Sequence, residues 1–325
     1  PDDHCGDTLP SHVAALHPKG LGMNEPRAPR SAPRSREAIS ASMPMRRAEP
    51  TPGRPLVSIV VPSLNQGRFI EATLRSILEQ DWTCLEILVV DGGSTDETLE
   101  VLGRLEGEPI AWTSEPDRGQ SDALNKGLRR ARGEILSYLN SDDLLLPGAV
   151  RAAVEALASA PGPAVVYGDL DVIDGDGRLL YRQPAPALTR RRMIDRGQYV
   201  TQPGSFWSRE VQEEVGLFDE GLKYAMDQDF YLRAAARFPL IRLPRAQAAF
   251  RMHEASKTSE SAERMWREAL RVSERHGLRP WHAWYWIRRA RHRGLRLLPR
   301  TIQARLLRLA GRPDAELLET PRKRP

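Results

Sequence analysis

Carboxylate and amide side chains recur in this chain at the ends of short apolar runs, where they could bind a polar ligand or a cation. Four of them stand in this position: Asn65, Asp91, Asp117 and Asp142. Asp142 is followed directly by Asp143, and adjacent carboxylates repel each other unless a cation lies near them. Asp and Asn also favour ordinary turns. Their recurrence at successive run ends nevertheless favours a binding site over a set of unrelated turns.

The apolar runs have the composition of buried strands, and amphipathic segments lie between them. We predict strands at 56–61, 85–90, 110–114, 134–139 and 164–167, and helices at 69–78, 94–105, 120–131 and 147–158. Ser94 and Glu97 are spaced as a capping box for the second helix. The alternation predicts an α/β fold with a mostly parallel sheet and helices on both faces. In such sheets ligands bind beyond the carboxyl ends of the strands.

Composition excludes several classes of protein. The chain has 325 residues, of which 40% are hydrophobic and 28% charged, the balance of a soluble globular protein. No apolar run approaches the roughly 18 residues of a membrane span, so a polytopic membrane protein is excluded. Cys5 and Cys84 are the only cysteines. They provide neither a disulfide framework nor metal-ligand spacing, which favours a reducing, cytoplasmic setting.

Charge divides the chain into three predicted regions. Residues 1–54 hold 9 of the 26 prolines, several beside arginines, and we predict a disordered arm. Residues 55–261 carry 23 Lys and Arg against 31 Asp and Glu, and form the predicted catalytic domain. Residues 262–325 carry 17 against 6, which predicts a basic, aromatic, helical tail with a separate role.

Four segments together are similar to one enzyme family. They are VVPSLNQG at 60–67, VDGGSTDET at 90–98, DRGQSDALNKG at 117–127 and NSDD at 140–143. In this order they resemble the family 2 glycosyltransferases, whose GT-A fold is a Rossmann-like domain that binds nucleotide-diphosphate sugars. The third segment resembles the branch that builds bacterial surface polysaccharides. The resemblance runs from about residue 55 to residue 258.

This resemblance implies inverting transfer of a sugar from a nucleotide-diphosphate sugar to an acceptor hydroxyl. UDP is the default nucleotide, with dTDP and GDP open, and the acceptor would be a glycan or a lipid-linked molecule. Pro62 and Asn65 would shape the nucleotide pocket. Asp91 would accept a hydrogen bond from the base, and Asp117 would also contact the nucleotide. Asp96, in the same segment as Asp91, could simply cap the helix that follows.

The resemblance also implies a divalent cation, Mg²⁺ or Mn²⁺, which oxygen ligands suit and which would neutralise the diphosphate. The family places an Asp-x-Asp motif here, and in this chain Asn140 takes the first position. Asp142 matches the second and is the predicted metal ligand, while Asp143 is expected in a supporting role or on the sugar. Helix capping is the alternative for this segment. His253 is the second predicted metal ligand, although a lone His is more often structural.

The acceptor side is expected in the second half of the domain. The segment YAMDQDFYLR at 224–233 resembles the family's acceptor motif, with Met226 where the family has Glu. Asp227 is then the predicted general base, and Asp229 is the fallback. Both also suit a helix N-terminus.

Three further residues complete the predicted site. Arg251 and Lys257 are candidates for phosphate contact, and otherwise are ordinary exposed cations. Trp207 could stack on an acceptor sugar, although a buried core position is at least as well supported by its type.

The tail joins aromatic residues at 281–286 to repeated arginines at 288–300. This composition suits an anionic membrane surface, and it equally suits a helical pair packed on the domain with its arginines outward. No nucleic-acid motif accompanies it, so no nucleic-acid partner is expected. We therefore predict a cytoplasmic enzyme that can sit on the inner face of the membrane.

Two other functions stay open at this stage. A sugar nucleotidyltransferase shares the α/β sheet, but it would want a Gly-rich, Arg-containing loop that residues 62–68 lack. A non-catalytic binder of nucleotide sugars is conceivable because Asn140 and Met226 depart from the family pattern, whereas Asp142, Asp227 and His253 argue against it.

Overall fold

The structure is a computed structural model, and it describes residues 53–197, 199–253 and 262–279. Nearly all of the predicted arm, residues 1–54, and most of the predicted tail lie outside these ranges, as does Lys257. Among the described residues, no helix has both the length and the apolar character needed to cross a membrane.

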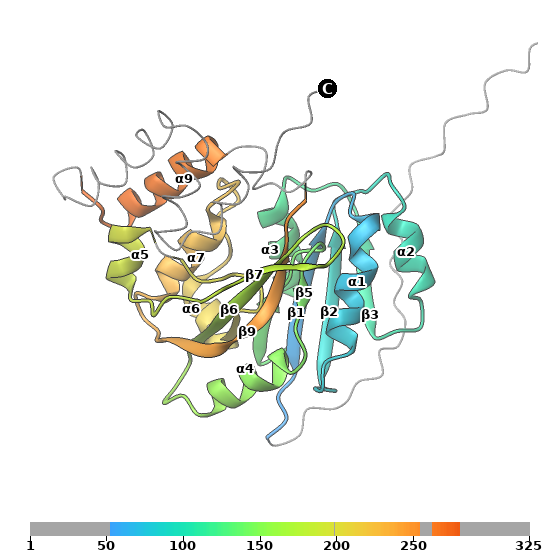
Figure 1. Ribbon diagram of the computed structural model, residues 1–325, viewed down its shortest axis with the longest axis horizontal. Helices are drawn as coiled ribbons and strands as arrows, with labels where there is room; N and C mark the ends of the chain where they lie inside the picture. The colour runs from blue at the N-terminus through green and yellow to red at the C-terminus, as the bar shows by residue number, and fades with distance from the viewer. Residues whose placement is uncertain (1–52, 198, 254–261, 280–325) are drawn as a thin grey trace, which may run out of the picture. The chain divides into compact units, whose positions relative to one another are not determined.

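The described residues form one nine-stranded sheet with helices on both faces (Figure 1). The strands are β1 (Val57–Ser63), β2 (Leu85–Asp91), β3 (Ile110–Ser114), β4 (Ile135–Tyr138), β5 (Leu144–Leu145), β6 (Val165–Ile173), β7 (Leu179–Gln183), β8 (Phe206–Ser208) and β9 (Leu240–Arg251). The helices are α1 (Gly67–Leu78), α2 (Thr98–Arg104), α3 (Gln120–Arg130), α4 (Ala149–Ala158), α5 (Arg190–Arg196), α6 (Arg209–Val215), α7 (Met226–Ala234) and α9 (Ala262–Arg275).

The sheet changes character half-way across. Its order is β3-β2-β1-β4-β8-β6-β9-β5, with β7 paired to β6. The first four strands are parallel, as the βα alternation predicts. Beyond β4 the sheet is mixed, because β8 pairs antiparallel with both β4 and β6 while β9 pairs parallel with β6. The parallel half places the carboxyl ends of β1, β2, β3 and β4 along one edge.

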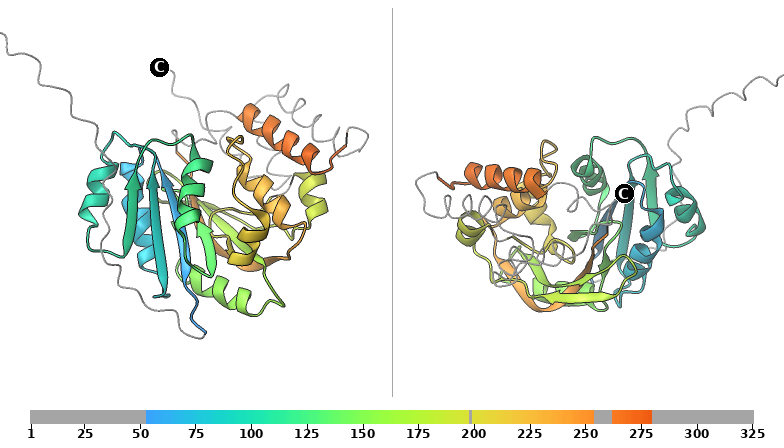
Figure 2. Two further views of the ribbon diagram at one scale, coloured as in Figure 1. Left: turned by 180° about the vertical axis from the view of Figure 1, so that it is seen from behind. Right: turned by 45° about the horizontal axis from the view of Figure 1, so that its top comes forward.

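Alternation along the buried strands divides the core into two layers. Val57, Ile59 and Val61 pack in a cluster with side chains of α1, α2 and α4. Val60 packs in the opposite cluster, which includes side chains of α3, α5, α6, α7 and α9. This alternation follows from the two-residue period of a strand. Figure 1 shows α1 in front of the sheet, and the left panel of Figure 2 shows α3 on the opposite face.

The boundary predicted at residue 261 does not separate two cores. Leu270 and Val272 of α9, and Leu278 beyond it, are buried in the same cluster as α7. In both figures α9 lies beside α5 and α7 (Figures 1 and 2). Helix α9, the first helix of the predicted tail, therefore belongs to the same globular unit as the sheet.

Candidate functional site

The parallel strands end in register at the edge where we predict nucleotide binding. Ser63 at the end of β1 is paired with Asp91, and Asp91 is paired with Ser114 of β3. Asp91 is fully buried. Its carboxylate accepts hydrogen bonds from the backbone N–H of Gly93 and Ser94 and from the hydroxyls of Ser94 and Ser114. Three of these four bonds end on Oδ2 and one on Oδ1, so Asp91 organises the loop. Its contact with a base stays a prediction.

The loops after β1 and β2 hold each other in place. Asn65 has φ +52°, a left-handed conformation that Asn tolerates. Its side-chain oxygen accepts from the N–H of Thr95. The predicted capping box is wrong, since α2 shows no cap from Ser94; Asp96 accepts from the N–H of Thr98 and from that of Gly67 at the start of α1. Pro62 is buried inside β1, two residues before the strand's exposed loop.

Asp117 reaches over the turn after β2. A Cβ built on Gly92 would lie 2.4 Å from Asp117 Oδ2, so that oxygen rests directly against the glycine backbone. Asp117 Oδ1 accepts from the N–H of Gly119. Within the described residues, Oδ2 has no hydrogen-bond donor. Asp117 therefore keeps one carboxylate oxygen that can accept a hydrogen bond from a ligand at this edge of the sheet.

The predicted metal ligands meet, although 111 residues separate them. Asp142 Oδ2 lies 3.0 Å from His253 Nε2. The side chains are 19% and 7% exposed, and the His253 ring packs on Phe69 of α1. A carboxylate oxygen and an imidazole nitrogen suit a divalent cation that takes further ligands from a diphosphate. The described residues contain no cluster of three or more His, Cys, Asp or Glu that could hold a metal alone.

Asn140 and Asp143 flank Asp142 and hydrogen-bond to each other. Asp143 is fully buried, and burial together with the charge of Asp142 raises its pKa well above the usual range. It accepts hydrogen bonds from the Asn140 amide and from the N–H of Arg251. The Asn140 oxygen in turn accepts from Gln120 of α3. Asp143 is thus a buried support for the strand end, and the structure gives it no direct access to a sugar.

Arg251 is a structural residue here. It is 5% exposed, and its guanidinium donates to the carbonyl oxygens of Asp142, Asp174 and Gly175. These bonds use Nε and Nη1 of the guanidinium and favour a structural role, and the predicted phosphate contact stays a prediction. Arg68, at the start of α1, lies over the ring of Phe69, which also contacts His253; its side chain is 65% exposed and pairs with Asp176. Nothing in the sequence separates Arg68 from any other surface arginine, so it was not predicted.

The two carboxylates on α7 have opposite environments. Asp227 is partly buried, and burial raises its pKa to about 6. Its Oδ1 accepts from the N–H of Gln228, and no donor in the described part of the chain reaches Oδ2. For Asp229, burial acts to raise the pKa, but hydrogen bonds from His276 and Arg233 outweigh it and lower the pKa. Asp229 is hydrogen-bonded to the side chains of His276 and Arg233, whereas Asp227 has an oxygen that can take a proton.

Trp207 does not line the acceptor side. It is fully buried in β8, and its indole N–H donates to Gln212. Its ring packs on Phe230 and Tyr231 of α7. The structure therefore supports the core position that its residue type allowed.

Side chains of α3 hydrogen-bond to Phe218, in the segment that leads into α7, and to Met226 at its start. The Asn125 side chain is almost fully buried, donates to the carbonyl of Phe218 and accepts from the N–H of the same residue. Ser121 donates to the Met226 sulfur. Both residues lie in the quoted DRGQSDALNKG segment, whose helical spacing predicted α3 but not what it would contact.

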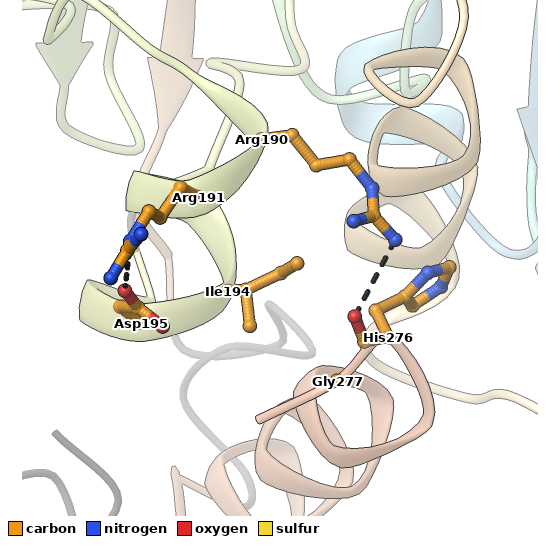
Figure 3. Close-up of a pocket in the computed structure, with 6 residues that line it drawn as sticks. All are labelled: Arg190, Arg191, Ile194, Asp195, His276 and Gly277. Atoms are coloured by element: carbon orange, nitrogen blue, oxygen red, sulfur yellow. Dashed lines mark hydrogen bonds and ion pairs between the residues drawn. The ribbon is translucent and has the colours of Figure 1, made fainter. Parts of the chain in front are cut away.

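A shallow pocket of about 500 Å³ lies elsewhere, between α5 and the end of α9 (Figure 3). It is lined by Arg190, Arg191, Ile194, Asp195, His276 and Gly277. None of the predicted site residues is among them, so this pocket is separate from the strand-end site.

Comparison with known proteins bears directly on the strand-end site. The Glycosyl transferase family 2 model matches residues 58–214, which contain β2, β3 and β4 and all of β1 except Val57. A glycosyltransferase of Mycobacterium tuberculosis is 34% identical over 184 residues, covering 56% of this chain and 69% of the relative. The chain belongs to glycosyl transferase family 2. This family 2 enzyme also matches the chondroitin synthase of Escherichia coli, at 31% identity over 55% of this chain and 26% of the synthase.

Solved structures agree with the fold of this family 2 enzyme. Residues 1–349 of S. aureus TarS, in complex with UDP-GlcNAc, align with a TM-score of 0.58 at 21% identity, covering 72% of each chain. The mannosyltransferase PcManGT from Pyrobaculum calidifontis, in complex with GDP-Man and Mn²⁺, aligns with a TM-score of 0.57 at 22% identity, covering 86% of this chain and 82% of the other. The predicted GT-A fold is confirmed, and the enzyme is a glycosyltransferase.

Proposed function

We propose that this glycosyltransferase moves a sugar, with inversion at the anomeric carbon, from a nucleotide-diphosphate sugar to an acceptor hydroxyl in the synthesis of a cell-surface polysaccharide. The observation that carries the proposal is Asp227, a partly buried carboxylate with a raised pKa and one oxygen without a donor among the described residues. A base of this kind is needed when a hydroxyl attacks.

The chemistry is a single displacement. The acceptor oxygen attacks the anomeric carbon while Asp227 takes the hydroxyl proton, and the bond from that carbon to the diphosphate breaks. One displacement at carbon inverts its configuration. The nucleoside diphosphate leaves with the bonding electron pair.

Asp142 and His253 would hold a divalent cation, with its remaining ligands from the diphosphate. When bound, the cation would neutralise charge on the leaving group. Asn65, Asp117 and the buried Asp91 would form the nucleotide pocket, with Asp117 Oδ2 facing the base. The nucleotide complexes of TarS and PcManGT support a nucleotide-sugar donor.

Calorimetric titration of UDP, dTDP and GDP, with and without Mn²⁺, tests the donor side. We expect one nucleotide to bind in a metal-dependent manner and Asp142→Asn to weaken it. Turnover tests the class of reaction. Release of nucleoside diphosphate supports a transferase, pyrophosphate would indicate a nucleotidyltransferase, and binding without turnover of any sugar nucleotide would indicate a non-catalytic binder.

We also propose peripheral association with an anionic membrane through the basic tail, most of which lies outside the described residues. The support is compositional, with a net charge of +11 over residues 262–325. Co-sedimentation with anionic vesicles at low salt, lost in a chain truncated after residue 279, is the expected result. No co-sedimentation would contradict it.

A further inference from the structure

The start of α7, which carries Asp227, has no cap from its N-cap residue. That residue is Ala225, whose side chain cannot accept a hydrogen bond, and within the first turn the N–H of Gln228 bonds to Asp227 itself. Alanine is among the poorest N-cap residues. A helix that begins this way leaves N–H groups without intrahelical partners. The N–H of Ala225 at the N-cap therefore needs an acceptor from outside the helix.

The missing acceptor comes from α9. Glu268 Oε1 accepts from the N–H of Tyr224 at 2.6 Å and from the N–H of Ala225 at 2.8 Å. Charge-assisted bonds from a carboxylate to backbone N–H groups are among the stronger hydrogen bonds in proteins. The two bonded residues directly precede the turn that contains Asp227.

Two further contacts tie the same helices together. The Gln228 amide donates to the Ser273 hydroxyl at 3.0 Å, and His276 Nε2 lies 2.9 Å from Asp229 Oδ1. The contacts thus run from the two residues before α7 into its first turn. All three α9-side partners lie beyond residues 58–214, where the family model matches. This connection belongs to the part of the chain that the family match does not cover.

We propose that Glu268 is a positioning residue that holds Asp227 in place for the reaction, and this rests on the proposed function of Asp227 as the base. Glu268 acts through the backbone of Tyr224 and Ala225 and touches no reacting atom. Without Glu268, the N–H groups of the two residues before α7 lose their carboxylate partner, and the Asp227 carboxylate shifts relative to the hydroxyl of the acceptor sugar. Displacements of about 1 Å at a reacting group can reduce rates about a hundredfold.

The charge of Glu268 has a separate consequence. Three ionisable groups interact electrostatically with Asp227: Tyr138 of β4, Tyr231 of α7 and Glu268 of α9. The tyrosines are neutral, because burial raises the pKa of each. Among these three groups, the carboxylate of Glu268 adds to burial in raising the pKa of Asp227.

The test compares Glu268→Ala, Glu268→Gln and a control, Glu274→Ala. Glu274 lies on the same helix, and its carboxylate has no hydrogen-bond or ion-pair partner within the described residues. Turnover is followed as nucleoside diphosphate release from UDP-, dTDP- and GDP-sugars, and amide hydrogen exchange is followed over residues 218–232. For Glu268→Ala we expect kcat to fall roughly tenfold or more with nucleotide Kd unchanged, and faster exchange at 224–228.

Glu268→Gln retains an acceptor oxygen but removes the charge. We expect it to recover most of the lost kcat and to move the acidic limb of the pH–rate profile to lower pH. That shift would not come from a merely structural role. Wild-type kcat and exchange in Glu268→Ala, or a Gln variant with no recovery and no shift, would overturn the proposal.

Asp227→Asn separates this inference from the proposed function. If that variant transfers sugar normally, the assignment of the base fails and the role of Glu268 fails with it. If Asp227→Asn is inactive while Glu268→Ala behaves as the wild type, only the inference about Glu268 fails.

Discussion

Asp227→Asn should abolish transfer and, at the same time, stabilise the fold at neutral pH. Burial raises the pKa of Asp227 from 3.8 to about 6. The folded-state pKa therefore lies above the unfolded value, and ionised Asp227 costs the folded state free energy. The cost is absent below pH 3.8, grows between 3.8 and about 6, and is constant above that. Asparagine is close in shape to aspartate and carries no charge to bury.

The magnitude follows from the shift. A difference of about two pKa units corresponds to about 3 kcal/mol, since each unit is worth about 1.4 kcal/mol. Partial exposure of Asp227 makes this an upper bound. At about 2–4 °C per kcal/mol for a domain of this size, we expect the melting temperature to rise by several degrees at pH 8. The gain should disappear near pH 4.

Asp229→Asn is the matched control, two residues along the same helix. Hydrogen bonds from His276 and Arg233 outweigh burial and lower the pKa of Asp229, so its ionised form stabilises the fold. The contribution is present above the unfolded pKa and is lost as pH falls. Asp229→Asn should therefore lower the melting temperature at pH 8.

Thermal unfolding at pH 4, 6 and 8, with nucleotide titration and turnover on the same preparations, measures all of this. Asp227→Asn should bind nucleotide as the wild type does and release no nucleoside diphosphate in the presence of acceptor. A melting temperature that falls for Asp227→Asn at pH 8 would refute the argument from burial. Normal transfer by Asp227→Asn with loss of transfer in Asp229→Asn would show that Asp229 is the base.

Three further outcomes are expected. The acidic limb of the wild-type pH–rate profile should have an apparent pKa of about 6, as Asp227 titrates; a limb below pH 4.5 would contradict this. Gly92→Ala adds a Cβ 2.4 Å from Asp117 Oδ2 and should weaken nucleotide binding in calorimetry about tenfold, as should Asp117→Ala, whereas equal affinity would remove Asp117 from the base pocket. Asn125→Ala leaves the backbone N–H and carbonyl of the buried Phe218 without their side-chain partner. Denaturant unfolding should therefore show that the free energy of unfolding falls by about 1–3 kcal/mol. The kcat of this variant should fall more than its nucleotide affinity. An unchanged kcat would limit Asn125 to stability.

The sequence by itself determined the fold class and the edge where the site lies. β-Branched runs and amphipathic spacing are local signals, and they place β1 to β4 and the helices between them to within a few residues. Parallel strands must end at a common edge, so Asn65, Asp91, Asp117 and Asp142 could be predicted to gather there. The ordered motifs then identified the family.

Tertiary structure alone decided what each of these side chains does. Asp91 and Arg251 carry the residue types of a ligand site, yet both are buried and hydrogen-bond to other parts of the chain. Trp207 is in the core because β8 lies between β4 and β6, a position that no local pattern specifies.

The same holds for the acceptor side. Asp227 and Asp229 share their residue type and a place in the first turn of α7. Asp229 alone is hydrogen-bonded by Arg233 of the same helix and by His276, while Glu268 contacts the backbone before Asp227. His276 and Glu268 lie more than 40 residues along the chain. Periodicity describes neighbours on one helix or strand, whereas burial and hydrogen bonding of a carboxylate depend on segments that only packing brings together.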